Sequence, residues 1–360
     1  MIPSFLESPR NRVIAVVVAI ALAAGVGVAL ASLSGGDDEA APTTTTTTTE
    51  GTTTTTAAPA PVAPLTGLPD DGSGRTARPA LVVKFDNVEP KARPQAGIVQ
   101  ADVVYEERVE GSVTRLLAIF HSTDAAPVGP VRSARTSDIA IFTPLNRPYF
   151  AWSGANDIFA ARIRESAMVD VGYDVQSGLY FRDGGRPAPS NLMAKGTADL
   201  LSVPSEGSGP PPALFTYRAE GEETPHLEPV TAVRVTYGSS AGSAPVEYRW
   251  NGTGWARAQA GTPHVDAGGV QVAPENVVIQ FTPYVGSGVA DQFGKEIPEA
   301  AMVGEGDAWI LTNGGLVAAR WSKPSLEAVT TYVDADGNPV KLTPGRTWVA
   351  LPPPGEGTKL

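Results

Sequence analysis

The sequence predicts an α+β protein in which an N-terminal mixed α/β region with a central sheet precedes a smaller, mostly β, hairpin-rich region. Between residues 65 and 203, short β-branched runs alternate with helix-like segments. A Pro- and Gly-rich break follows at residues 203–213, and only strand-like runs come after it. This change of pattern is typical of two differently built regions. We assign residues 65–203 to an N-terminal α/β domain, 204–228 to a linker and 229–360 to a C-terminal β domain.

The N-terminal region is predicted to hold three strands and two helices. The strands lie within residues 79–87, 101–110 and 114–122, which are β-branched runs bounded by turn residues. A short helix is expected after the Gly129-Pro130 turn, and Pro144 ends it. Residues 156–169 form the strongest helix candidate, with Asn156 or Asp157 as its cap. Its imperfect apolar stripe consists of Ile158, Ala161, Ile163 and Ala167.

The C-terminal region is predicted to be all β, as a sandwich or a curled sheet. Strand-like runs occupy residues 231–237, 246–258, 276–285, 308–321 and 330–342, and a last strand lies within 344–354. Three Asx-Gly pairs supply the positive φ angles that tight hairpin turns need. They are Asn251-Gly252, Asn313-Gly314 and Asp336-Gly337.

The N-terminus carries an uncharged apolar run of 21 residues from Val13 to Leu33. A helix of this length spans about 30 Å, enough for the hydrocarbon core of a membrane. Arginines precede the run and acidic residues follow it, so the positive-inside rule places residues 1–12 in the cytoplasm and the rest outside. The alternative is a cleavable signal peptide, because Ala29-Leu30-Ala31 has the form of a cleavage site.

Residues 34–64 read as a Thr- and Pro-rich disordered stalk, because they lack the apolar side chains that would offset ordering entropy. The net charge of −11 disfavours nucleic acid as a partner. The chain contains no cysteine, which excludes disulfides, thiolate metal sites, cysteine nucleophiles and thioether lipidation.

No standard catalytic motif is present, and we expect no catalytic residue, metal or cofactor. The histidines, at 121, 226 and 264, have no metal-binding helical spacing. His264 and Asp266 share one strand face and are expected to form a surface pair beside a turn. The "DADGNP" stretch starts like a calcium loop, but its twelfth position is Gly345, so a hairpin turn is the better interpretation.

The candidate binding site is a group of charges in the N-terminal region. Glu106 and Glu107 alternate along a strand, so at most one is expected to point inward. Arg132 and Arg135 are expected on one helix face with Asp138, near the helix N-terminus, where an anion would be held. A structural network of ion pairs is the competing explanation. The candidate anion-binding residues are Arg115, Arg132, Arg135, Arg182, Asn191, Glu106 and Asp138.

Long strings of the chain resemble the YerB-like family of bacterial proteins, which are described as lipoproteins. The strings include "RPQAGIVQADVVYEERVEGSVTRLLAIF", "GPVRSAR" and "YFRDGGRPAPSNL", and the resemblance runs from Leu65 to about Pro354. It implies an extracytoplasmic, membrane-tethered protein with an N-terminal α/β-type domain and a separate C-terminal β domain. It carries no established catalytic set. Because this chain lacks cysteine, anchoring falls to the apolar helix instead of a lipid.

Two functions follow as hypotheses. The leading one is a non-catalytic binding or scaffold protein of the cell envelope, held to the membrane by the helix from Val13 to Leu33, with peptidoglycan or wall-synthesis proteins as partners. The alternative is an enzyme acting on phosphorylated or acidic envelope glycans, with Glu106, Glu107 or Asp138 as base or metal ligand. The architecture is similar, by analogy alone, to that of LytR-type wall-polymer phosphotransferases. A chaperone-like factor would instead predict an exposed apolar groove.

Overall fold

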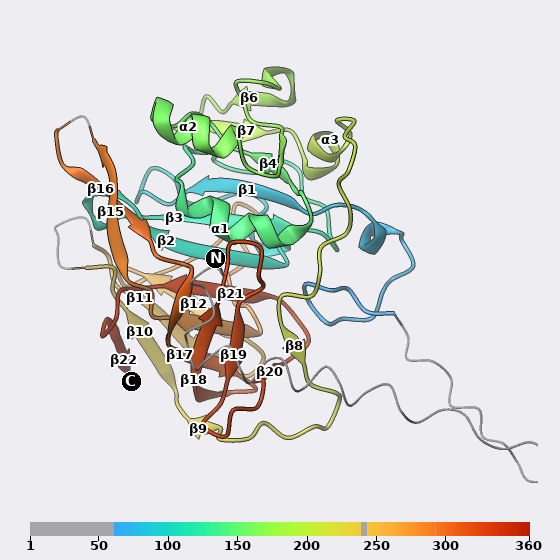
Figure 1. The fold of residues 1–360 in the computed structure, drawn as a ribbon, viewed down its shortest axis with the longest axis vertical. Coiled ribbons are helices and arrows are strands. Elements are labelled where there is room, and N and C mark those ends of the chain that lie inside the picture. The colour runs from blue at the N-terminus through green and yellow to red at the C-terminus, as the bar shows by residue number, and fades with distance from the viewer. Residues whose placement is uncertain (1–60, 239–242, 292) are drawn as a thin grey trace, which may run out of the picture. The chain divides into compact units, whose positions relative to one another are not determined.

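A computed structural model describes residues 61–238, 243–291 and 293–360 of the chain (Figure 1). These residues form mostly sheet, with few helices. No helix among them is long and apolar enough to cross a membrane. The predicted anchor from Val13 to Leu33 lies outside the described residues, as does most of the predicted stalk.

The centre of the fold is an eleven-stranded sheet. Its strands are β1 (Leu81–Asp86), β2 (Val103–Arg108), β3 (Thr114–Phe120), β4 (Tyr149–Ala151), β5 (Val169–Asp170), β9 (Glu228–Pro229), β14 (Asn276–Gln280), β17 (Gly304–Thr312), β18 (Gly315–Lys323), β19 (Thr331–Val333) and β21 (Thr347–Leu351). Their order is β19-β18-β17-β14-β21-β2-β3-β1-β4-β5, and β9 pairs with β18. The strands predicted from β-branched runs are therefore confirmed in both regions.

The sheet continues from the N-terminal region into the C-terminal region. Strand β2 runs parallel to β21, with Glu106 opposite Ala350, and β21 in turn pairs with β14. Backbone hydrogen bonds therefore join the two regions that the sequence separates. Their division into domains stays a prediction from the sequence.

One face of the sheet is covered by helices α1 (Ser137–Phe142) and α2 (Asp157–Arg164). Phe142 and Phe159 pack there with Val82 and Leu117 of the sheet. Helix α2 begins at the predicted cap, because the Asn156 side chain accepts a hydrogen bond from the Ile158 N–H at 3.0 Å. It ends earlier than predicted, at Arg164.

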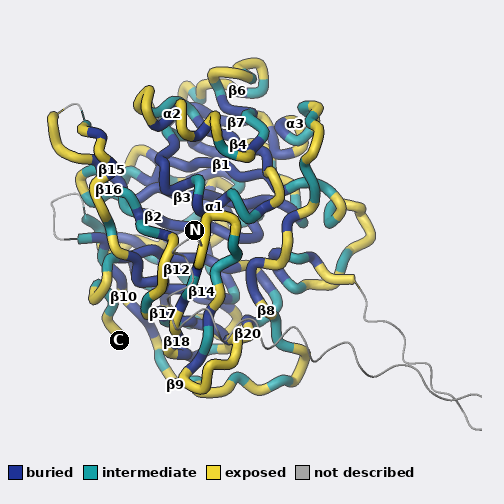
Figure 2. The backbone as a smooth tube through the Cα atoms, in the orientation of Figure 1, coloured by how far each residue is buried: buried dark blue, intermediate teal, exposed yellow. Residues whose placement is uncertain are grey.

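The opposite face of the sheet is covered by a second, five-stranded sheet. Its strands are β10 (Ala232–Val235), β11 (Val246–Trp250), β12 (Trp255–Gln259), β13 (Thr262–Pro263) and β22 (Gly357–Lys359), in the order β13-β12-β11-β10-β22. Its buried Tyr248 and Trp255 share a core with Val83 and Trp348 of the central sheet. The central strands are consequently buried on both faces, as the dark tube in Figure 2 shows.

The remaining elements lie around these layers. They are the strand pairs β6 (Tyr180–Arg182) with β7 (Leu192–Ala194), β8 (Thr216–Tyr217) with β20 (Lys341–Leu342) and β15 (Tyr284–Ala290) with β16 (Glu296–Ala300), and helix α3 (Thr197–Leu201).

The folded part begins earlier than the predicted boundary at Leu65. Ala63 is buried, and Val62 forms a β-bridge with Pro69, although both residues were assigned to the stalk. The predicted linker also contributes to the core through Leu214 and Phe215, which are buried against it. Apolar side chains within both segments explain why they pack instead of remaining solvated.

Candidate functional site

Three of the four arginines in the predicted anion site, Arg115, Arg132 and Arg135, lie close together, but not on a helix. Helix α1 begins only at Ser137, so the expectation that Arg132 and Arg135 share a helix face is wrong. The segment before α1 is extended because its backbone pairs with neighbouring strands: the Arg132 N–H donates to the Lys84 carbonyl at 2.8 Å, and the Val131 N–H donates to the Leu192 carbonyl. Both arginines therefore precede helix α1 instead of lying on it.

Two of these arginines are paired with carboxylates. Arg135 forms a bidentate pair with Glu110, with its Nη2 2.6 Å from Oε1 and 2.7 Å from Oε2. Arg132 is partly exposed, and its Nε lies 3.3 Å from an Asp86 carboxylate oxygen. Asp86 also accepts a hydrogen bond from the Ser190 hydroxyl at 2.7 Å.

Arg115 differs from its neighbours. It is 7% exposed, and no carboxylate among the described residues lies within ion-pair distance of it. Its Nη1 donates to the Ser133 carbonyl at 2.8 Å, while its Nε is buried without a hydrogen-bond partner. Burial, and then the positive charges of Arg135 and Arg132, lower the pKa of Arg115 to about 9. An added anion here would relieve both effects.

The side chains of Glu106 and Glu107 lie on opposite faces of strand β2, and both are fully buried. The expectation that at most one of Glu106 and Glu107 points inward is wrong, because each face of the sheet is covered by another layer. Glu107 lies on the helix-covered face and Glu106 faces the second sheet. Alternation along β2 is as predicted, but neither face meets solvent.

Glu106 holds the two sheets together and does not face the arginine group. Its Oε1 accepts hydrogen bonds from Arg257 Nη2 at 2.7 Å and from the Thr114 hydroxyl at 2.9 Å. Its Oε2 accepts from Trp348 Nε1 at 3.0 Å and from the Tyr248 hydroxyl at 3.4 Å. Every partner is buried, so this carboxylate stabilises the fold and does not face solvent.

His264 extends the same buried network and is not on the surface. Its Nδ1 lies 2.7 Å from Arg257 Nη1, and its Nε2 lies 2.7 Å from the Gln95 side-chain oxygen. The arginine donates to Nδ1, so Nε2 carries the proton and the ring is neutral. Asp266 is also buried, and its Oδ1 accepts from the Gly268 N–H at 2.9 Å. The predicted surface pair is therefore wrong, because the turn packs against the loop that holds Gln95, whose carbonyl accepts a hydrogen bond from the Ala267 N–H at 2.8 Å.

Asp138 is likewise committed to a buried network on the helix-covered face. Its Oδ1 lies 2.6 Å from the Lys84 Nζ, which also lies 2.5 Å from Glu107 Oε1. The Ser137 hydroxyl donates to Glu107 Oε2 at 2.5 Å. Lys84, Glu107 and Asp138 have no exposed surface.

The remaining candidates are Arg182, the last residue of β6, and Asn191, at the end of the loop between β6 and β7. The Arg182 Nη1 donates to the Asn191 side-chain oxygen at 2.7 Å. Arg182 also lies over the Tyr173 ring. The same loop lines a hollow of about 510 Å³ with the loop at residues 90–94. Its walls include Lys91, Arg93 and Arg186, none of which was among the candidates.

The basic side chains of this hollow differ in the hydrogen bonds and ion pairs that they form with the protein. Arg186 donates to the Ala92 and Pro94 carbonyls, and Arg93 pairs with Glu89. Burial, and then the charge of Arg257, lower the pKa of Arg93 to about 10. Lys91 is exposed, so it is the accessible cation of the hollow.

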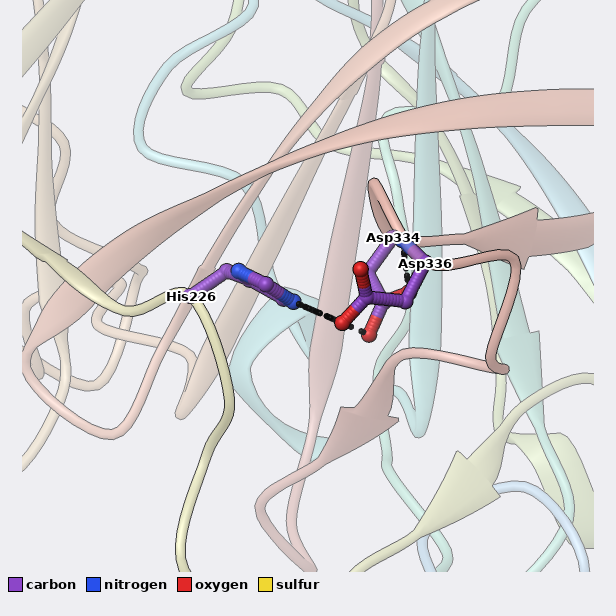
Figure 3. Close-up of side chains that lie close together, drawn as sticks. All are labelled: His226, Asp334 and Asp336. Carbon is purple, nitrogen blue, oxygen red and sulfur yellow. Dashed lines mark hydrogen bonds and ion pairs between the residues drawn. The ribbon is translucent and has the colours of Figure 1, made fainter.

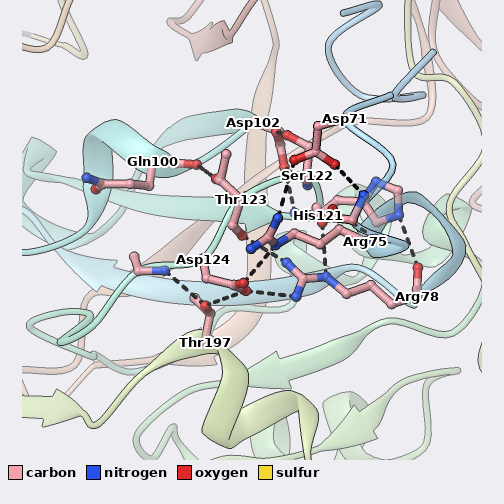
Figure 4. A network of polar contacts seen from close by, with 12 residues as sticks. Asp71, Arg75, Arg78, Gln100, Asp102, His121, Ser122, Thr123, Asp124 and Thr197 are labelled. Carbon is pink, nitrogen blue, oxygen red and sulfur yellow. Dashed lines mark hydrogen bonds and ion pairs between the residues drawn. The ribbon is translucent and has the colours of Figure 1, made fainter. Parts of the chain in front are cut away.

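A further polar network fastens the start of the folded chain to the sheet (Figure 4). Asp102 accepts hydrogen bonds from the His121 and Ser122 N–H groups and from the Ser122 hydroxyl. Arg75 and Arg78 both pair with Asp124. The His121 Nε2 lies 3.0 Å from the Arg78 carbonyl oxygen.

The described residues contain one group with donor atoms close enough to hold a metal ion, His226, Asp334 and Asp336 (Figure 3). His226 Nε2 lies 2.8 Å from Asp336 Oδ2, and Asp334 Oδ1 accepts from the Asp336 and Asn338 N–H groups. These contacts close the "DADGNP" stretch as a hairpin turn, as predicted, with Gly337 at positive φ. A hydrogen bond between His226 and the turn that holds Asp334 and Asp336 accounts for the group.

The sequence analysis does not single out the buried cations Lys84 and Arg257. Lys84 lies in "LVVKFD", where every residue is buried, and Arg257 lies in "WARAQ", where alternate residues are buried. A basic side chain on a buried face of a strand requires a buried acid. The sequence contains this signal, but it can be used only when it is known which strand faces are covered.

Comparison with known proteins agrees with the resemblance seen in the sequence. Residues 65–205 match the protein of unknown function (DUF3048) N-terminal domain, and residues 233–349 match the DUF3048 C-terminal domain. "Putative lipoprotein YerB" of Bacillus subtilis (strain 168) is 29% identical over 307 residues, covering 81% of this chain and 86% of that protein. The crystal structure of the Bacillus subtilis YerB protein superposes with a TM-score of 0.70 and 25% identity, covering 83% of this chain and 99% of the other. The chain therefore belongs to the DUF3048 family, whose two domains it carries in order.

Proposed function

We propose that this chain is a membrane-tethered, extracytoplasmic protein of the bacterial envelope that binds an anionic ligand without transforming it. The similar Bacillus protein is named a lipoprotein, which supports attachment to a membrane from outside the cytoplasm. This chain has no cysteine for a lipid thioether, so the apolar run from Val13 to Leu33 supplies the tether.

The observation that carries the binding proposal is Arg115. A guanidinium that is 7% exposed and lacks a directly paired carboxylate is electrostatically costly. Arg132 and Arg135 lie near enough to lower its pKa. A phosphate or carboxylate group of an envelope polymer would neutralise the excess charge, and the planar fork of arginine suits both anions.

Binding is favoured over catalysis because the acids that would act as bases are engaged elsewhere. Glu106 is held by Arg257, and both Glu107 and Asp138 are held by Lys84. All three are inaccessible to solvent. As binding partners we propose anionic wall polymers, peptidoglycan or the proteins that assemble them.

The test is calorimetric titration of the purified full chain with inorganic phosphate, against sodium chloride at matched ionic strength. We expect saturable phosphate binding that weakens at least tenfold, or about 1.4 kcal/mol, in Arg115→Gln and in Arg132→Gln. Arg132 is partly exposed, so its variant remains informative if Arg115→Gln loses stability. The matched control is Arg249→Gln, which removes an exposed arginine from the second sheet.

Equal affinities of the wild type and both arginine variants would refute the site. A loss of phosphate affinity in Lys91→Gln alone would show that phosphate binds in the hollow between the loops at residues 90–94 and 183–187. That result would also refute the site at Arg115. Protease treatment of intact cells tests the location separately: the folded part should be degraded from outside.

A further inference from the structure

A lysine and two carboxyl groups meet in the interior on the helix-covered face of the sheet. Lys84 of β1, Glu107 of β2 and Asp138 of the first turn of α1 are each 0% exposed. The Lys84 Nζ lies 2.6 Å from Asp138 Oδ1 and 2.5 Å from Glu107 Oε1. The amine is therefore held in contact with both acids, with water excluded.

The two acids differ in protonation. Burial, reinforced by the negative charge of Glu107, raises the pKa of Asp138 to about 7 in spite of Lys84. Burial also acts on Glu107, but the charge of Lys84 and the hydrogen bonds from Lys84, Ser137 and Asp138 together outweigh it and hold the pKa of that carboxyl below its usual range. Asp138 therefore holds a proton more readily than Glu107, so in the pair Asp138 is suited to be the acid and Glu107 the base.

We propose that this trio is an autocatalytic cross-linking site, in which the Lys84 Nζ forms an amide with the Asp138 side-chain carbonyl carbon while Glu107 moves the protons. The inference is independent of the anion site, because none of the three groups is accessible from solvent.

The reaction balances without an oxidant or a co-reactant. Glu107 takes one proton from the ammonium group, and the freed nitrogen lone pair attacks Asp138 Cγ. Charge that develops on Asp138 Oδ2 is stabilised by the Arg135 backbone N–H, which donates to this oxygen at 2.8 Å. A second ammonium proton reaches Oδ1 through Glu107, the Cγ–Oδ1 bond breaks, and water leaves. The third proton stays on the amide nitrogen, and Glu107 ends protonated.

Two physical effects favour the step. Fixed contact between the groups replaces a bimolecular encounter with an intramolecular one. The product replaces buried charges with a neutral amide, which removes their desolvation cost.

The test is mass spectrometry of the full chain, purified under denaturing conditions because the amide survives them. Trypsin cannot cleave after an acylated Lys84, so residues 76–91 should remain joined to residues 136–162, lighter than the two peptides together by one water. We expect nearly all of the folded chain to carry this link. Cleavage after Lys84 in the folded wild-type protein, with both peptides at their sequence masses, would overturn the proposal.

Two variants test the roles of the side chains. Lys84→Arg keeps a cation but cannot form the amide, and Glu107→Gln keeps the shape but removes the base, so neither should lose water. Full cross-linking in Glu107→Gln would overturn the role of Glu107. Linkage of Lys84 to residues 92–108, which contain Glu107, would overturn the choice of Asp138. If a variant does not fold, the wild-type peptide map still decides.

Discussion

The buried contact between Glu106 and Arg257 should be a major determinant of stability, although the sequence placed Glu106 in a binding site. The perturbation is Glu106→Gln, which keeps the shape of the side chain and removes its charge. Arg257 would then be a fully buried cation without a counter-ion. Removing one partner of a buried ion pair costs about 3–5 kcal/mol.

The hydrogen bonds around Glu106 support that magnitude. Both carboxylate oxygens face donors: the Arg257 guanidinium, the Thr114 hydroxyl and the Trp348 indole N–H. An amide NH₂ group placed at either oxygen would meet one of these donors instead of an acceptor. The resulting unsatisfied polar groups each cost about 1–3 kcal/mol.

The assay is urea unfolding of the full chain, followed by tryptophan fluorescence, as a double-mutant cycle with Arg257→Met. We expect each single variant to lose about 3–5 kcal/mol of unfolding free energy. The double variant should lose clearly less than the sum, with an interaction energy of about 2 kcal/mol or more. Additive losses, or a loss below about 1 kcal/mol in Glu106→Gln, would show that this pair does not hold the two sheets together.

Two smaller perturbations test other parts of the structure. Burial, and then the charges of Arg257 and Arg93, hold the pKa of His264 well below its usual range, so the unfolded state binds the extra proton. Unfolding free energy should therefore fall as the pH drops below about 6.5, by at most about 1.4 kcal/mol per pH unit, and the slope should flatten in His264→Gln; an unchanged slope would contradict a neutral buried ring. At the start of α2, Asn156→Ala should lose about 1 kcal/mol of unfolding free energy while Asn156→Ser retains it, measured by urea unfolding. Equal stabilities would show that the cap contributes nothing.

Much of the secondary structure could be predicted because its signals are local. β-Branched runs, Asx-Gly turns and the Asn156 cap act within a few residues, and the structure confirms the elements they predict. The helix predicted around Arg132 is wrong because the local sequence does not decide between a helix and an extended segment. Either conformation can satisfy the hydrogen bonds of the Arg132 backbone. The carbonyl of Lys84, nearly fifty residues earlier in the chain, decides between them.

The contacts of the candidate residues could be predicted only in part. The sequence grouped Arg115, Arg132 and Arg135 as candidates, but it could not show that Glu106 pairs with Arg257 on the opposite face of the sheet or that Lys84 pairs with Asp138. Residue spacing reports which side chains share a face, and says nothing about what packs against that face.

By itself, the sequence determined the family, the strands, the turns and the absence of cysteine chemistry, all of which reside in composition or in short strings. Only the tertiary structure decided that β2 joins β21 and that both faces of the central sheet are buried. The physical reason is that distant segments decide whether a charged side chain is exposed to a ligand or buried in an ion pair. These segments meet only when the chain folds.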